Sequence, residues 1–288
     1  MAGLTLDALF RRTLAEFEAA DLPAEDARHL VSGVLGLTLT EMVTEAGREI
    51  DPEECAAVEA AVERRKRREP VYRILGAREF YGLDFLLSPE TLEPRPDTET
   101  LVAAVLPHLN RLVEERGTVR FADLGTGTGA IAIALLKHCA GANALATDIS
   151  AEALETARSN ALINGVADRF ECARGFWYDA VIGRYDVIVS NPPYIGSADI
   201  EGLEPEVREH DPRAALDGGA DGLDAYRVIA AGAADHLSEE GLVAVEVGFD
   251  QKVVVSAIFA AAGFNLLDAV RDFGGNDRVL IFAGRDAA

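Results

Sequence analysis

Cysteine and histidine are scarce in this chain of 288 residues. It contains three scattered cysteines, Cys55, Cys139 and Cys172, and five histidines. No Cys-x-x-Cys pair occurs, and no His or Cys spacing is typical of a metal site, which argues against a disulfide framework and a zinc site. The sequence therefore predicts reduced thiols, no bound metal and a cytoplasmic location.

Basic side chains are also few. Lys and Arg number 27 against 49 Asp and Glu, which gives a formal net charge of −22. Because a nucleic-acid enzyme needs a basic field to neutralise phosphates, we predict no direct binding of nucleic acid. The one basic cluster, Arg64–Arg68, is interpreted as a solvated helix end. Contact with an acidic partner surface or with ribosomal RNA is the alternative.

Long apolar runs are missing as well. No run reaches the length of about 18 residues that a membrane helix needs, so we expect no membrane span. Residues 1–21 lack an apolar leader core and carry acids early, so we expect no signal or transit peptide. With 49% hydrophobic residues, the chain can still bury one large core and leaves room for a second, small domain.

The first part of the chain, residues 1–70, has apolar positions at helical spacing, which predicts a small helical bundle. The expected starts of its helices lie near Leu6, Pro23, Thr40 and Pro52. Residues 71–89 are interpreted as a hairpin linker to the second domain.

Residues 90–288 alternate apolar strands with helices, which predicts an α/β domain with a seven-stranded, mostly parallel sheet covered on both faces. The expected strands span 119–124, 142–148, 169–173, 185–190, 242–247, 266–271 and 278–283, the last two as an antiparallel pair. The loop 196–221 is long for a compact domain, so we expect a functional lid. Its residues Glu206, Arg208 and Arg213 are expected to be structural rather than catalytic.

The most informative stretch is Asn191-Pro192-Pro193-Tyr194, which follows the β-branched run Tyr185–Ser190. Such a run is typical of a buried strand, and two consecutive prolines cannot continue it or begin a helix interior. An amide (Asn191) and backbone carbonyls therefore stand at the carboxyl end of a strand, where open α/β sheets bind ligands. These groups can accept both hydrogens of a substrate NH2 group and turn its lone pair outward.

A glycine-rich turn follows the strand that ends near Asp123. Gly125, Gly127 and Gly129 allow positive φ angles and a close approach of the backbone to a ligand. Their spacing differs from that of the dinucleotide fingerprint. Asp123 suits a cationic or amino-bearing ligand better than a pyrophosphate, which it would repel. We expect the whole loop, Thr126 and Thr128 included, to bind a cofactor.

The next strand ends in Asp148, 25 positions after Asp123, which is about the spacing of a βαβ unit. This places Asp148 beside the glycine loop, where a carboxylate can bind ribose hydroxyls. Ser150 is expected to cap the helix that follows.

Together these residues resemble the class I, S-adenosylmethionine-dependent methyltransferases of Rossmann-like fold. They are more closely similar to the HemK/PrmC family of glutamine N5-methyltransferases that act on peptide-chain release factors. The stretches that carry the resemblance are Pro94–Glu99, Asp123–Gly129, Ser190–Ile195, Asp211–Gly219, Asp221–Asp224 and Asp272–Arg278. Arg95–Glu99 is the specific part, because Asn-Pro-Pro-Tyr is shared with adenine-N6 methyltransferases.

The resemblance implies S-adenosyl-L-methionine as cofactor, S-adenosylhomocysteine as product, and the Gly-Gly-Gln glutamine of a class 1 release factor as target. The outer face of the helical domain is expected to grip this protein substrate. The Asn191 side-chain oxygen and the Pro192 carbonyl would hold the target NH2 group, with Pro193 completing the substrate site. The π-face of Tyr194 would favour the developing positive charge. No general base is evident, and we expect a monomer.

One departure concerns the adenine. After the third strand the family usually has an acid followed by a bulky residue, whereas this chain reads Arg174-Gly-Phe-Trp-Tyr178. Matching Trp177 to the family's aromatic residue leaves Phe176 in place of the acid. An ungapped match puts Phe176 at the aromatic position and Gly175 at the acid. We favour Trp177 as the residue that stacks on adenine; a tryptophan of the hydrophobic core is the alternative.

Three other functions compete. Adenine-N6 methylation of DNA or RNA uses the same chemistry on a flipped base, but the acidic composition argues against it. Methylation of a ribosomal protein's glutamine is a second alternative, since sister enzymes usually differ in the Arg95–Glu99 stretch. A module that only senses a nucleoside would have no use for two acceptors aimed at an amine.

Overall fold

The computed structural model describes residues 4–284, which fall into two compact units. The helical unit comprises residues up to Ala77 together with the segment Pro205–His210. The α/β unit comprises Arg78–Glu204 and the residues from Asp211 onward. Part of the loop 196–221 thus belongs to the helical unit.

The helical unit packs its helices around a core of aliphatic side chains and one phenylalanine. Its helices are α1 (Leu6–Ala19), α2 (Ala24–Leu35), α3 (Leu39–Thr44), α4 (Pro52–Lys66), α5 (Val71–Leu75) and α9 (Pro205–Arg208). Leu6, Leu9, Phe17, Leu30 and Val58 are completely buried. The predicted helical bundle is therefore confirmed, and its second helix begins after Pro23 as expected.

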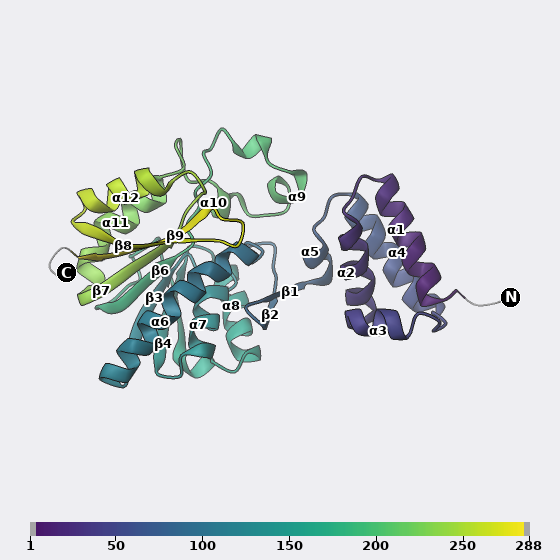
Figure 1. Cartoon of the computed structure of the whole chain (residues 1–288), viewed down its shortest axis with the longest axis horizontal. Helices are drawn as coiled ribbons and strands as arrows, with labels where there is room; N and C mark the ends of the chain where they lie inside the picture. Colours follow the sequence, from purple (N-terminus) through teal and green to yellow (C-terminus); the bar gives the residue numbers. More distant parts are fainter. Residues whose placement is uncertain (1–3, 285–288) are drawn as a thin grey trace. The chain divides into compact units, whose positions relative to one another are not determined.

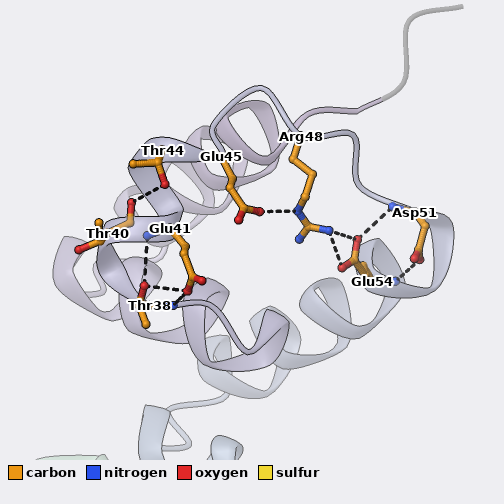
Figure 2. A network of polar contacts seen from close by, with 8 residues as sticks. All are labelled: Thr38, Thr40, Glu41, Thr44, Glu45, Arg48, Asp51 and Glu54. Atoms are coloured by element: carbon orange, nitrogen blue, oxygen red, sulfur yellow. Dashed lines mark hydrogen bonds and ion pairs between the residues drawn. The ribbon is translucent and has the colours of Figure 1, made fainter.

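The third helix is capped by Thr38 and begins at Leu39, one residue before its expected start near Thr40. Figure 2 shows Thr38 accepting from the Glu41 backbone N–H at 3.2 Å while the Glu41 carboxylate accepts from the Thr38 N–H at 2.7 Å. Both residues fit the capping-box pattern of a hydroxyl residue and a glutamate three positions later. Thr40, near which the helix start was expected, lies two residues after this cap.

A second capping box begins α4. The Glu54 N–H donates to Asp51 at 2.8 Å, and the Asp51 N–H donates to the Glu54 carboxylate at 3.2 Å. Arg48 reaches from the preceding loop to Glu54 at 2.9 Å and to Glu45 at 3.5 Å (Figure 2). The cap and the ion pairs together fix the connection between α3 and α4.

We expect Asp51→Ala to lower the free energy of unfolding by about 1 kcal/mol, because the Glu54 N–H in the first turn loses its side-chain acceptor. Urea unfolding followed by circular dichroism measures this change. Asp51→Ser keeps a capping oxygen and is expected to restore most of the loss; equal loss in both variants would contradict a capping role.

Acids of the same unit pair with four residues of the basic run Arg64–Arg68, namely Arg64, Arg65, Lys66 and Arg68. Arg65 is only 3% exposed and lies 2.8 Å from Asp26 and 3.0 Å from Glu206. The interpretation of a solvated helix end is thus wrong for Arg65. Glu206 anchors the Pro205–His210 segment, because Arg68 also lies 3.4 Å from it.

The α/β unit is built on the predicted seven-stranded sheet. A small hairpin, β1 (Ala77–Phe80) and β2 (Leu83–Leu86), precedes it. The sheet strands are β3 (Val119–Leu124), β4 (Ala142–Asp148), β5 (Phe170–Arg174), β6 (Tyr185–Ser190), β7 (Leu237–Glu246), β8 (Phe264–Arg271) and β9 (Asp277–Gly284). Their order is β5-β4-β3-β6-β7-β9-β8, and only β9 runs antiparallel to its neighbours.

Helices cover both faces of this sheet, as Figure 1 shows. One face carries α6 (Glu99–Arg116), α7 (Ala130–His138) and α8 (Ala151–Ile163); the other carries α11 (Asp224–His236) and α12 (Lys252–Ala261). Short turns of helix occur at Pro96–Thr98, Ala167–Arg169, Ile200–Gly202 and Arg213–Leu216. Along β6, Val187 and Val189 join the first core and Ile188 joins the second. This alternation is the period of a strand buried on both faces.

The strand order reverses between β3 and β6, because β3 is followed in sequence by β4 on one side and pairs with β6 on the other. Asp123 of β3 lies opposite Val189 of β6. The glycine loop and Asn-Pro-Pro-Tyr therefore leave the sheet side by side, at the switch point where open sheets bind ligands. Within residues 4–284, no helix is long and apolar enough to cross a membrane.

Candidate active site

A cavity of about 670 Å³ opens at the carboxyl ends of the parallel strands, within the α/β unit. Its walls come from the stretch before α6, the loops after β3, β4, β5 and β6, and α11. The residues predicted for the site that line it are Gly125, Thr126, Gly127, Thr128, Asp148, Trp177, Asn191 and Pro193. A volume of this size is that of a small-molecule site.

The glycine loop takes the shape that its sequence predicts. Gly125, Gly127 and Gly129 have φ angles of 73°, 55° and 80°, in the left-handed region that favours glycine. The N–H groups of Gly125 and Thr126 both donate to the Thr147 carbonyl at 2.9 Å, which ties the loop to β4. Gly129 caps α7 and does not line the cavity; a β-carbon there would lie 2.9 Å from Ile133.

Asp123 lies beneath this loop rather than in the cavity. Its side chain is completely buried, and Oδ2 accepts from the Thr126 hydroxyl at 2.7 Å. Burial raises the pKa of Asp123 to about 7, with Thr126 opposing the shift. The carboxylate thus supports the loop from below. It does not line the cavity, so it is not placed to contact an amino-bearing ligand directly.

Asp148 ends β4 and lines the cavity. Its Oδ2 accepts from the Gly127 N–H and its Oδ1 accepts from the Ser150 N–H, each at 2.9 Å. These bonds fix the plane of the carboxylate, and each oxygen keeps a further lone pair for a ligand. Ser150 caps α8 as predicted, accepting from the Ala153 N–H at 3.1 Å.

Two aromatic side chains line the cavity after β5. Phe176 is 57% exposed, and its ring centroid lies 5.8 Å from that of Trp177 in an edge-to-face arrangement. Trp177 also packs against the core on the α11 side and has a φ angle of 49°. Both aromatic residues are placed to contact a planar ligand.

The Asn-Pro-Pro-Tyr segment divides between the cavity and the interior. Asn191 and Pro193 line the cavity, whereas Pro192 is buried and the Tyr194 side chain packs against the core behind it. The Asn191 Nδ2 group donates to the Thr98 hydroxyl at 3.2 Å, so the side-chain oxygen is the atom left for a ligand. Burial raises the pKa of Tyr194 to about 12, so its hydroxyl remains protonated.

Comparison with known proteins supplies the family. Residues 8–76 match the PrmC N-terminal domain, and residues 101–202 match the methyltransferase small domain. A release factor glutamine methyltransferase of Agrobacterium fabrum is 57% identical over 272 residues, which cover 94% of this chain and 94% of that protein. The chain belongs to the release factor glutamine methyltransferase family. The resemblance to HemK/PrmC enzymes is thereby confirmed.

Further relatives agree with this membership. A release factor glutamine methyltransferase of Bradyrhizobium diazoefficiens is 47% identical over 258 residues, covering 88% of this chain and 86% of that protein. A solved methyltransferase structure from Pyrococcus furiosus has a TM-score of 0.53 at 22% identity and covers 78% of this chain and 96% of that one. The structural likeness shows the fold alone.

Ion pairs join several of the stretches that carry the family resemblance, and one buried residue, Glu246, was not singled out from the sequence. Arg95 lies 2.6 Å from Asp211, whose side chain is almost completely buried, so the stretch before α6 is tied to the long loop. Arg278 lies 3.0 Å from Asp272 and 3.3 Å from Asp97. Glu246, at the end of β7, is 1% exposed. The sequence offered one signal for Glu246, because an acidic residue at the end of the apolar strand β7 is unusual.

Proposed function

We propose that the protein transfers a methyl group from S-adenosylmethionine to the side-chain amide nitrogen (N5) of the glutamine in the Gly-Gly-Gln motif of class 1 release factors. The observation that carries the proposal is the presence of Asn191 and Pro193 in one cavity with the glycine loop and Asp148. An amine-holding group and a nucleoside-type site in a single cavity are what direct transfer to an NH2 group requires. Membership of the release factor glutamine methyltransferase family supports the target.

The cavity residues have the chemistry needed to hold S-adenosylmethionine, which supplies an electrophilic methyl group on a sulfonium. The Asp148 carboxylate suits ribose hydroxyls, and the glycine loop lets the backbone approach the ligand. Phe176 and Trp177 offer faces for the adenine, and Trp177, partly held by the core, is the one we propose to stack on it. Asp123 would act through Thr126, by holding the loop.

Asn191 would orient the target nitrogen. Its oxygen would accept one hydrogen of the glutamine NH2 group. The Pro192 side chain is buried, but its backbone lies between two cavity-lining residues, so its carbonyl would accept the second hydrogen. An amide nitrogen is a poor nucleophile because its lone pair is delocalised, so the contribution of these groups is to hold that lone pair toward the methyl carbon at near-attack distance. They also stabilise the positive charge that develops on nitrogen. Tyr194 would act from behind the cavity wall, through the buried carboxylate of Glu246.

A transfer assay with radiolabelled S-adenosylmethionine, the full-length chain and an intact class 1 release factor tests the proposal. The matched control is the same factor with alanine in place of the Gly-Gly-Gln glutamine. We expect label on the intact factor alone. Label on neither factor would overturn the proposal, and ribosomal protein, DNA and RNA would then be offered as substrates in the same assay.

The setting of the reaction is also proposed. The charge of −22 favours a protein partner over a polyanion, so we propose a cytoplasmic enzyme that does not bind nucleic acid directly. We further propose that it acts as a monomer, with the helical unit contacting the release factor.

A further inference from the structure

Glu246 is a buried carboxylate directly behind the substrate wall of the cavity. It ends β7, which runs parallel to β6 with Val245 opposite Ser190, the residue before Asn191. Its side chain is 1% exposed and does not line the cavity. A buried charge is costly unless polar groups compensate it, so the groups around Glu246 matter for its ionisation.

The polar groups around Glu246 come from four elements, one of which is α11, where the Tyr226 hydroxyl donates to the Glu246 backbone carbonyl at 2.9 Å. The hydroxyls of Thr98, at the end of the turn before α6, and Tyr194, after β6, lie near enough to the carboxylate to lower its pKa. Arg278 of β9 lowers that pKa through its charge, and Asp97 raises it. Within the described part of the chain, Oε2 has no partner at hydrogen-bonding distance. The balance is dominated by burial, which raises the pKa of Glu246 to about 7.

Thr98 connects this carboxylate to the amide that faces the substrate. An ionised carboxylate can only accept hydrogen bonds, so a Thr98 hydroxyl that bonds to Glu246 donates its one proton to it. Thr98 then has only lone pairs to offer Asn191, so the group that it contacts at 3.2 Å must be the NH2 end of the amide. The Asn191 oxygen is thereby turned to the other side.

We propose that Glu246 and Thr98 are positioning residues that fix which end of the Asn191 amide meets the target NH2 group. The inference rests on the proposed function, because only an amine substrate requires an acceptor at this place. When Glu246 is protonated, Thr98 is released from donating to it and can donate to the Asn191 oxygen instead. The reversed Asn191 amide would then present its own NH2 group to the NH2 group of the target glutamine, and the two donors cannot form the required hydrogen bond. The Tyr194 hydroxyl, held protonated by burial, stabilises the ionised form of Glu246.

The test is the pH dependence of kcat for release-factor methylation at saturating substrates, measured from about pH 5.5 to about pH 9. In the wild-type enzyme, kcat is expected to fall as the pH drops through the pKa of Glu246. In Glu246→Gln, which cannot ionise, we expect kcat to be about 10- to 100-fold lower at high pH and the fall at low pH to disappear. The KM for S-adenosylmethionine should stay within about twofold, since Glu246 lies outside the cavity.

Thr98 supplies a matched pair of variants. Thr98→Val keeps the shape but removes the hydroxyl and is expected to lower kcat about as much as Glu246→Gln. Thr98→Ser keeps the hydroxyl and should restore most of the rate. Equal rates in the valine and serine variants, or an unchanged low-pH fall in Glu246→Gln, would overturn the proposal.

One control removes a competing source of the pH dependence. Asp123 has a pKa raised to about 7 as well, so Asp123→Asn must keep the low-pH fall if Glu246 is its source. Label transfer by the wild-type enzyme is the reference throughout. If the wild-type enzyme does not methylate the factor, the proposed function fails; if it does and these variants behave like it, only the positioning role fails.

Discussion

Replacing Asn191 by alanine is expected to lower kcat for release-factor methylation by about 10²- to 10³-fold while leaving the affinity for S-adenosylmethionine within about threefold. The side-chain oxygen is one of two proposed acceptors for the target NH2 group, and it contributes most when charge develops on the nitrogen. Without it, the amide is free to rotate its lone pair away from the methyl carbon. Asn191 also lies on the β6 side of the cavity, whereas Asp148 is on the β4 side, so cofactor binding should survive.

Single-turnover label transfer measures the rate, and isothermal titration calorimetry measures cofactor binding. Val228→Ala, which alters the same cavity on α11, is the matched control and should retain most of the rate. Asn191→Asp separates two roles, because it keeps an acceptor but cannot donate to Thr98. Turnover close to wild type in Asn191→Ala would contradict the proposed mechanism.

Much of the α/β unit was predictable because its local signals agree. Apolar runs indicated the strands, glycines indicated the loop after β3, and consecutive prolines marked the end of β6. Since parallel strands share one carboxyl edge, strand order alone brought Asp148 and Asn191 to the same cavity. Bringing these two residues together did not require any prediction of contacts between residues distant in sequence.

The groups behind the cavity could not be predicted in the same way. Asn191 and Thr98 are 93 positions apart, and nothing in the sequence near either residue reports their hydrogen bond. Arg65 and Glu206, 141 positions apart, pair through the same kind of long-range packing. Such pairs are set by the tertiary fold, and periodicity carries no information on them.

The aromatic residues after β5 show a different limit. Trp177 takes a φ angle of 49°, which a bulky residue rarely adopts, and a local alignment cannot anticipate such a backbone. The turn brings Phe176 and Trp177 to the cavity together. The choice between them therefore depends on which ring the adenine contacts, and the proposal for Trp177 rests on its packing against the core.

Asp148→Ala is expected to weaken S-adenosylmethionine binding by about 10- to 100-fold, which corresponds to about 1.4 to 2.7 kcal/mol for hydrogen bonds to a charged acceptor. Part of that loss would come from the loop itself, because the Gly127 and Ser150 N–H groups both lose their acceptor. A cofactor analogue without the ribose 2′-hydroxyl separates the two contributions. The wild-type enzyme should bind this analogue more weakly than S-adenosylmethionine.

In Asp148→Ala the difference in affinity between cofactor and analogue is expected to vanish, because no carboxylate remains to accept a hydrogen bond from the ribose hydroxyl. Asp148→Asn keeps one acceptor oxygen and should fall between the two, with the loop held at one N–H group only. Isothermal titration calorimetry measures the binding of both ligands to the wild-type enzyme, Asp148→Ala and Asp148→Asn. If Asp148→Ala weakens both ligands equally and discrimination persists, Asp148 supports the loop and another group binds the ribose.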